Sequence, residues 1–127
     1  MPPQAARDPD AVRPIGVAVN QATDTVYATN TFDSNGNPGT TVSVIDGATC
    51  NATVTIGCGD TPATATVGSR PSGLAVNQAT NTIYVANQTA TVSVINGATC
   101  NATHTSGCSQ APPMVRLGAM AAATQPD

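Results

Sequence analysis

The chain repeats one unit, and this duplication limits its possible folds more than any other feature of the sequence. The segment TVSVIDGATCNATVTIGC at 41–58 recurs as TVSVINGATCNATHTSGC at 91–108, with 15 of 18 positions identical. The tracts that precede these copies, 15–30 and 72–87, share 10 of 16 positions. A period of 50 to 57 residues, built from short apolar runs, is typical of repeat proteins whose units stack on one another.

Each unit predicts four short antiparallel strands. They are expected at 15–20, 25–30, 41–46 and 63–67 in the first unit, and at 72–77, 82–87, 91–96 and 113–117 in the second. Polar turns separate them, including the turn dipeptides Asp46-Gly47 and Asn96-Gly97. Apolar or small side chains occupy both faces of each strand, as expected when a sheet packs between neighbouring sheets. The prediction is an all-β fold in which each unit is a four-stranded meander like the blade of a propeller, with a free-standing β-sandwich as the alternative.

The repeated tract PxGVAVNQATxTxYxxN, followed by TVSVI[DN]GAT, resembles the YVTN-type bacterial β-propeller repeat. The name-giving tetrapeptide is imperfect in both copies, Tyr27-Ala28-Thr29-Asn30 and Tyr84-Val85-Ala86-Asn87. The resemblance implies two four-stranded propeller blades, at 13–69 and 70–118. The flanking segments have no apolar periodicity, so we expect a disordered lead-in (1–12) and a disordered tail (119–127). It implies no particular activity, because members of the family have different roles or no assigned one.

Two blades do not close a propeller, which carries at least four. We expect the remaining blades either in a longer chain of which this is a fragment, the interpretation that we favour, or in further copies that self-associate. Segment 1–12 lacks the apolar core of a signal peptide, which fits a true N-terminus further upstream.

The charge pattern argues against nucleic acid as a partner, and the lack of a long apolar run argues against a membrane span. All seven acidic residues are Asp, all four basic residues are Arg, and the net charge is −3. Because the basic residues form no cluster, the chain lacks the electrostatic footprint of a nucleic-acid-binding protein. Since no apolar run approaches 18 residues, we expect no membrane span.

Four cysteines form two identical pairs with seven intervening residues, Cys50 with Cys58 and Cys100 with Cys108. Four cysteines allow three connectivities, and the repeat favours the local one in each unit. The rival is a zinc site with His104 as a ligand, but this spacing is unusual for zinc and His104 aligns with Val54. We expect structural disulfides, hence an extracellular or cell-surface location, and no metal or other cofactor.

The first unit carries extra residues within TFDSNGNPG (31–39). Asp33, Asn35 and Asn37 alternate like the first ligands of a calcium loop, but Pro38 and Val44 occupy positions where such a loop needs Gly and Glu. A turn-rich surface loop is therefore the expected structure. Because propeller ligands usually bind in such loops, the candidate ligand-binding residues are Phe32, Asp33, Asn35 and Asn37.

Catalysis finds little support in the composition. The chain has one His and no Glu, and it contains no nucleophile elbow and no glycine-rich phosphate loop. The leading hypothesis is a secreted or cell-surface bacterial scaffold that binds further blades and recognises an extracellular protein or carbohydrate. The alternative is the non-catalytic part of a lyase-like or lactonase-like propeller enzyme, with active-site residues outside this chain.

Overall fold

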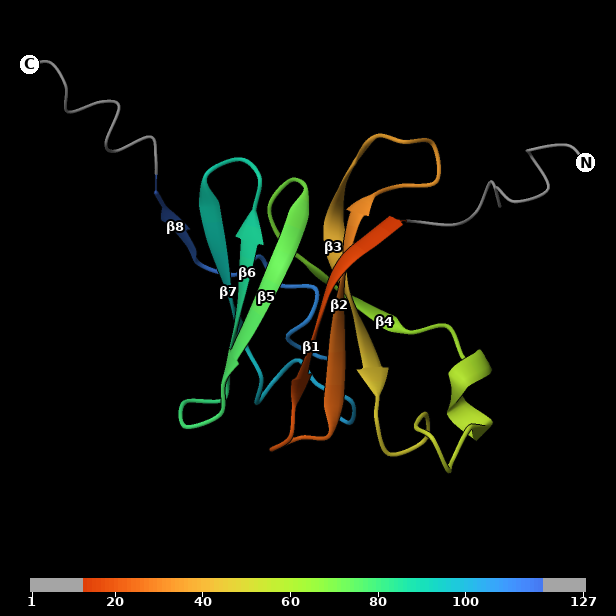
Figure 1. The fold of residues 1–127 in the computed structure, drawn as a ribbon. Helices are drawn as coiled ribbons and strands as arrows, with labels where there is room; N and C mark the ends of the chain where they lie inside the picture. The colour runs from red at the N-terminus through yellow and green to blue at the C-terminus, as the bar shows by residue number, and fades with distance from the viewer. Residues whose placement is uncertain (1–12, 118–127) are drawn as a thin grey trace, which may run out of the picture.

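The computed structural model describes residues 13–117, which form two four-stranded antiparallel sheets and one short 3₁₀ turn, Ile56–Gly59 (Figure 1). The strand order is β1-β2-β3-β4 in the first sheet, here sheet A, and β5-β6-β7-β8 in the second, sheet B. Both are meanders, as predicted. The strands of sheet A are β1 (Arg13–Asn20), β2 (Thr25–Phe32), β3 (Pro38–Asp46) and β4 (Ala63–Thr66); those of sheet B are β5 (Pro71–Asn77), β6 (Thr82–Asn87), β7 (Thr91–Asn96) and β8 (Met114–Arg116). The expected lead-in and tail lie outside the described residues.

The extra residues of the first unit lengthen a hairpin rather than forming a long loop. β2 extends to Phe32 and β3 begins at Pro38, and these two residues pair after a register shift beyond Asn30. The unpaired loop is therefore only 33–37, shorter than the sequence predicted. An inserted tract that can pair across a hairpin does so, because this satisfies its backbone donors and acceptors.

The two sheets pack together through different faces, so residues at equivalent positions of the repeat are buried in one sheet and more exposed in the other. Tyr27 is fully buried between the sheets, whereas its counterpart Tyr84 lies on the outer face of sheet B and is 40% exposed. The opposite holds for the neighbouring position. Ile83 is fully buried between the sheets, and its counterpart Val26 lies on the outer face of sheet A, half-buried. The two copies of the sheet are therefore stacked front to back.

A core of small aliphatic side chains, one tyrosine and the second disulfide fills the space between the sheets. Its buried members are Tyr27, Val42, Val44, Ala65, Val67, Ile83, Val85, Ile95, Cys100 and Cys108. The chain has one Phe and no Trp, so dense packing of β-branched residues supplies most of the buried apolar area.

The first strands of the two sheets, β1 and β5, lie side by side (Figure 1). Their backbones approach so closely that a methyl group on Gly16 would collide with the carbonyl oxygen of Ser72. The Thr29 hydroxyl donates to the same carbonyl at 3.1 Å, and the Asn20 side chain donates to Asn81 at 2.7 Å. Glycine at position 16 thus allows the two sheets to meet along this edge.

Candidate functional site

The connections between strands separate to two ends of the molecule, as the meander predicts (Figure 1). One end, here the turn end, carries the β2–β3 turn and the linker from sheet A to sheet B. The other end, here the cysteine end, carries both excursions between the third and fourth strands. Binding residues lie disproportionately on loops held by a rigid scaffold, so both ends are candidate sites.

At the turn end, Asp33 closes its own turn. Its Oδ1 accepts the backbone N–H groups of Asn35 and Asn37, each at 2.9 Å, and its backbone carbonyl accepts the N–H of Gly36 at 3.0 Å. Gly36 has φ +86°, a conformation that favours glycine. The alternating Asp and Asn residues therefore stabilise the turn through hydrogen bonds to Asp33, as expected for a turn-rich surface loop.

Phe32, at the base of this turn, lies beside two arginines. The guanidinium carbons of Arg13 and Arg70 are 5.9 and 5.8 Å from the centroid of its ring. Both distances are within the range for cation–π attraction, which contributes about 0.5 to 1 kcal/mol at an exposed site. Arg13 begins β1 and Arg70 immediately precedes β5, so the adjacent first strands bring the two charges together.

Arg70 adopts an unusual backbone conformation for a residue that is not glycine. Its φ is 55°, and its backbone is fixed on both sides, since its N–H donates to Gly39 at 2.8 Å and its carbonyl accepts from Gln88 at 3.0 Å. A left-handed conformation costs an ordinary residue about 1 kcal/mol. Asp24, Asn81 and Ala90 have the same left-handed φ in turns of the chain, so at Arg70 this conformation reflects the reversal of the backbone before β5.

A shallow pocket of about 190 Å³ adjoins these residues. It is lined by Asn30, Phe32, Asp33, Pro38, Gly39, Thr40 and Thr41. Arg13 and Arg70 do not line this pocket; they lie beside it, next to the ring of Phe32. The two guanidiniums next to this ring can bind an anionic group, because each offers several donors in a planar fork. Of the four residues predicted to bind a ligand, the structure places Phe32 against the arginines and Asp33 in the pocket lining, while Asn35 and Asn37 are exposed.

The sequence prediction did not include Arg13 and Arg70 among the binding residues. A signal was present, because Arg-Pro opens both units at equivalent positions. Residues that precede equivalent first strands must lie at the same end of adjacent sheets.

At the cysteine end, both predicted disulfides are formed, Cys50–Cys58 and Cys100–Cys108. The two excursions share one local structure. The Asn101 side chain donates to Gly97 and accepts from the backbone of residues 103 and 104, and Asn51 makes the same bonds to Gly47 and residues 53 and 54. His104 is exposed, and within the described range of 13–117 no cluster of three or more His, Cys, Asp or Glu side chains could hold a metal.

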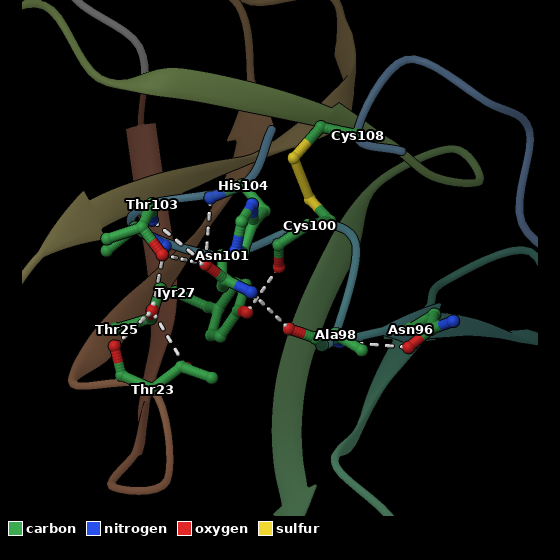
Figure 2. The surroundings of a disulfide bond; sticks show 12 residues. Thr23, Thr25, Tyr27, Asn96, Ala98, Cys100, Asn101, Thr103, His104 and Cys108 are labelled. Carbon is green, nitrogen blue, oxygen red and sulfur yellow. Dashed lines mark hydrogen bonds between the residues drawn. A yellow bond between two sulfur atoms is a disulfide. The ribbon is translucent and has the colours of Figure 1, made fainter. Parts of the chain in front are cut away.

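The second disulfide lies near Tyr27 of sheet A and belongs to the same core (Figure 2). The Tyr27 hydroxyl donates to the Cys100 carbonyl at 2.6 Å, and the Ala102 N–H donates to the Thr25 hydroxyl at 2.9 Å. Burial raises the pKa of Tyr27 to about 12, against a smaller opposing effect of the Thr25 hydroxyl. The cysteine end of sheet B is thus part of the contact between the sheets.

We expect this contact to weaken at alkaline pH. The pKa of Tyr27 is about 12 in the folded chain and near 10.0 when unfolded, so the folded state retains the proton longer. The resulting stability is complete below pH 10 and is lost as the pH rises towards 12, by about 2 kcal/mol. Denaturant unfolding at pH 8 to 12 measures it. Tyr27→Phe removes this dependence and Tyr84→Phe retains it; equal alkaline loss in Tyr27→Phe would refute the assignment to Tyr27.

In comparisons with known proteins, no protein-family model matches this chain, and no curated protein matches it. No helix in the range 13–117 has both the length and the apolar character needed to cross a bilayer.

Proposed function

We propose that this chain is a segment of a secreted or cell-surface β-propeller that acts as a structural and recognition scaffold. The observation that carries the proposal is the front-to-back packing of sheets A and B. In a propeller, every sheet presents one face to the preceding sheet and the other to the next, with the first strands together at the centre. The adjacency of β1 and β5 supports this arrangement.

The disulfides support the extracellular location. Small, aromatic-poor sheets have limited apolar area to bury, and cross-links of this kind persist in oxidising compartments. Each closes a short loop, with a separation of 8 residues, and contributes about 2 to 3 kcal/mol in the chain-entropy model.

The turn end is the ligand-binding end in this proposal. Arg13 and Arg70 concentrate positive charge beside Phe32 on a chain whose net charge is −3. The ligand is an extracellular protein or carbohydrate that presents a carboxylate or sulfate group, because such groups match the guanidinium donors.

Binding of a sulfated oligosaccharide, an acidic peptide and their neutral analogues, followed by NMR chemical shifts, tests this site. At least one anionic probe should bind and shift residues 32–41, and binding should weaken as salt increases. Arg13→Gln combined with Arg70→Asn should weaken binding by about tenfold or more, since Asn tolerates the backbone conformation at position 70.

Arg116→Gln is the control for the effect of charge alone, because it removes one positive charge from β8 in sheet B, away from the site. It should leave binding unchanged. Equal binding of anionic and neutral probes, no binding of any probe, or an equal loss in Arg116→Gln would contradict the proposed site.

A further inference from the structure

The outer face of sheet A carries the residues equivalent to those on the inner face of sheet B, which packs against sheet A. Val17 and Val19 are 68% and 50% exposed on β1, whereas their counterparts Leu74 and Val76 pack against the core between the sheets. The same relation holds for three half-buried residues of this face and their buried counterparts in sheet B: Val26 with Ile83, Ala28 with Val85, and Ile45 with Ile95.

The outer face of sheet B shows the reverse relation. Tyr84 is 40% exposed, and its counterpart Tyr27 is fully buried against sheet B. Val92 and Val94 lie beside Tyr84 on β7 and are half-buried, while their counterparts in sheet A, Val42 and Val44, belong to the core. Each outer face therefore has the side-chain pattern of one half of the existing contact between the sheets.

We propose that a second copy of this chain docks front to back on the first, with the outer face of sheet A in one copy packed on the outer face of sheet B in the other. The new contact repeats the existing one between sheets A and B. The inference rests on the scaffold role proposed above and names the partner of that scaffold. The two faces are different surfaces, so the contact is heterologous and can repeat to a ring or a filament.

The polar groups that the new contact needs are already in position. Thr82 makes the same two bonds to Thr80 that Thr25 makes to Thr23, one from the Thr80 hydroxyl at 3.0 Å and one to its carbonyl at 3.1 Å. Thr25 also accepts the N–H of Ala102 across the existing contact. Thr82 would accept the N–H of Ala52 from the second copy in the same way.

The hydroxyl of Tyr84 has an equivalent target. Tyr27 donates to the carbonyl of Cys100, and the matching carbonyl is that of Cys50 in the second copy. The excursion that carries Cys50 already has the conformation of its counterpart, because Asn51 and Asn101 make the same bonds to their turns. Asn77, the counterpart of Asn20, would donate to Asp24 of the second copy.

Gly73 provides the space for this contact. Its counterpart Gly16 is required because a methyl group there would collide with the Ser72 carbonyl of the other sheet. Around Gly73 the nearest atom to an added methyl group is the Ala86 Cβ at 3.9 Å, so no neighbour within residues 13–117 of the single chain requires glycine there. In the docked pair, Gly73 would face the carbonyl of Ile15, the counterpart of Ser72. Two hydroxyl bonds are not reproduced: Thr29 and Thr31 donate to the carbonyls of Ser72 and Pro71 across the existing contact, and their counterparts are Ala86 and Gln88.

Sedimentation velocity of the full chain over a range of concentrations tests the proposal. The unmodified chain should associate as concentration increases. Gly73→Ala should weaken association by about tenfold or more through the clash of its methyl group with the second copy. Val17→Asp should do the same by placing an unpaired carboxylate in the contact. Both variants should retain the circular dichroism spectrum of the folded chain, because both positions are exposed in the single copy.

A mixture of the two variants distinguishes front-to-back docking from other arrangements. Gly73→Ala weakens only the sheet B side of the contact and Val17→Asp only the sheet A side, so each variant alone should be mainly monomeric at a concentration where the unmodified chain associates. Mixed, the intact sheet A of the first should bind the intact sheet B of the second and give a dimer that grows no further. Association of either variant alone as strong as that of the unmodified chain, no dimer in the mixture, or a monomeric unmodified chain at all concentrations would overturn the proposal. Because no anionic ligand takes part, this assay and the ligand-binding assay can fail independently.

Discussion

Gly16→Ala is expected to lower the free energy of unfolding by about 3 kcal/mol or more, the upper part of the range for an overpacked contact. The added methyl group would meet the backbone carbonyl of Ser72, and backbone in a paired strand cannot turn aside as a flexible side chain can. β1 and β5 would have to separate, exposing the core between the sheets. Denaturant unfolding followed by circular dichroism measures the change.

Gly73→Ala is the matched control for this prediction. Gly73 occupies the equivalent position in sheet B, but its nearest neighbour to an added methyl group is the Ala86 Cβ at 3.9 Å. At concentrations where the chain is monomeric, this variant should change the free energy of unfolding by less than about 1 kcal/mol. Equal destabilisation by the two substitutions would show that the sheets do not approach as described.

The second disulfide is expected to contribute more stability than the first. Cys100→Ala with Cys108→Ala should lower the free energy of unfolding by about 4 kcal/mol, of which about 2 to 3 kcal/mol comes from the cross-link and the rest from lost packing. Cys100 and Cys108 are 1% and 4% exposed and belong to the core between the sheets.

The matched control is Cys50→Ala with Cys58→Ala, which opens a loop of the same sequence separation, 8 residues. Cys50 is half-buried and Cys58 is exposed, so only the loss of the cross-link, about 2 to 3 kcal/mol, is expected. Thermal and denaturant unfolding of both double variants measures the difference. A larger loss from the first disulfide than from the second would contradict the description of the core.

Local features of the fold could be predicted from the sequence because local signals determine them. The duplication fixed the number of strands, the meander order and the local pairing of Cys50 with Cys58 and of Cys100 with Cys108. Apolar alternation and the Asp-Gly and Asn-Gly turns predicted the third strand of each unit. The predicted C-terminal residues of these strands, Asp46 and Asn96, are the ones at which β3 and β7 end.

The burial of individual residues could not be predicted in the same way. Tyr27 and Tyr84 have nearly identical neighbours in sequence, yet one is fully buried and the other is 40% exposed. This difference arises only when two similar sheets stack, since one face of each is then covered. The Arg13–Phe32–Arg70 group was missed for a related reason. Arg13 and Phe32 are paired between β1 and β2, but Arg70 comes beside the ring only when sheet B stacks on sheet A.

Tyrosine nitration of the folded chain tests the front-to-back packing of the two sheets most directly, because the chain has two tyrosines and they occupy equivalent positions. The reaction is carried out at a concentration where the chain is monomeric, and the modified residues are identified by peptide mass mapping. The packing described here predicts that Tyr84 is nitrated while Tyr27 is protected until the chain unfolds. Equal reactivity of the two tyrosines in the folded chain would contradict it.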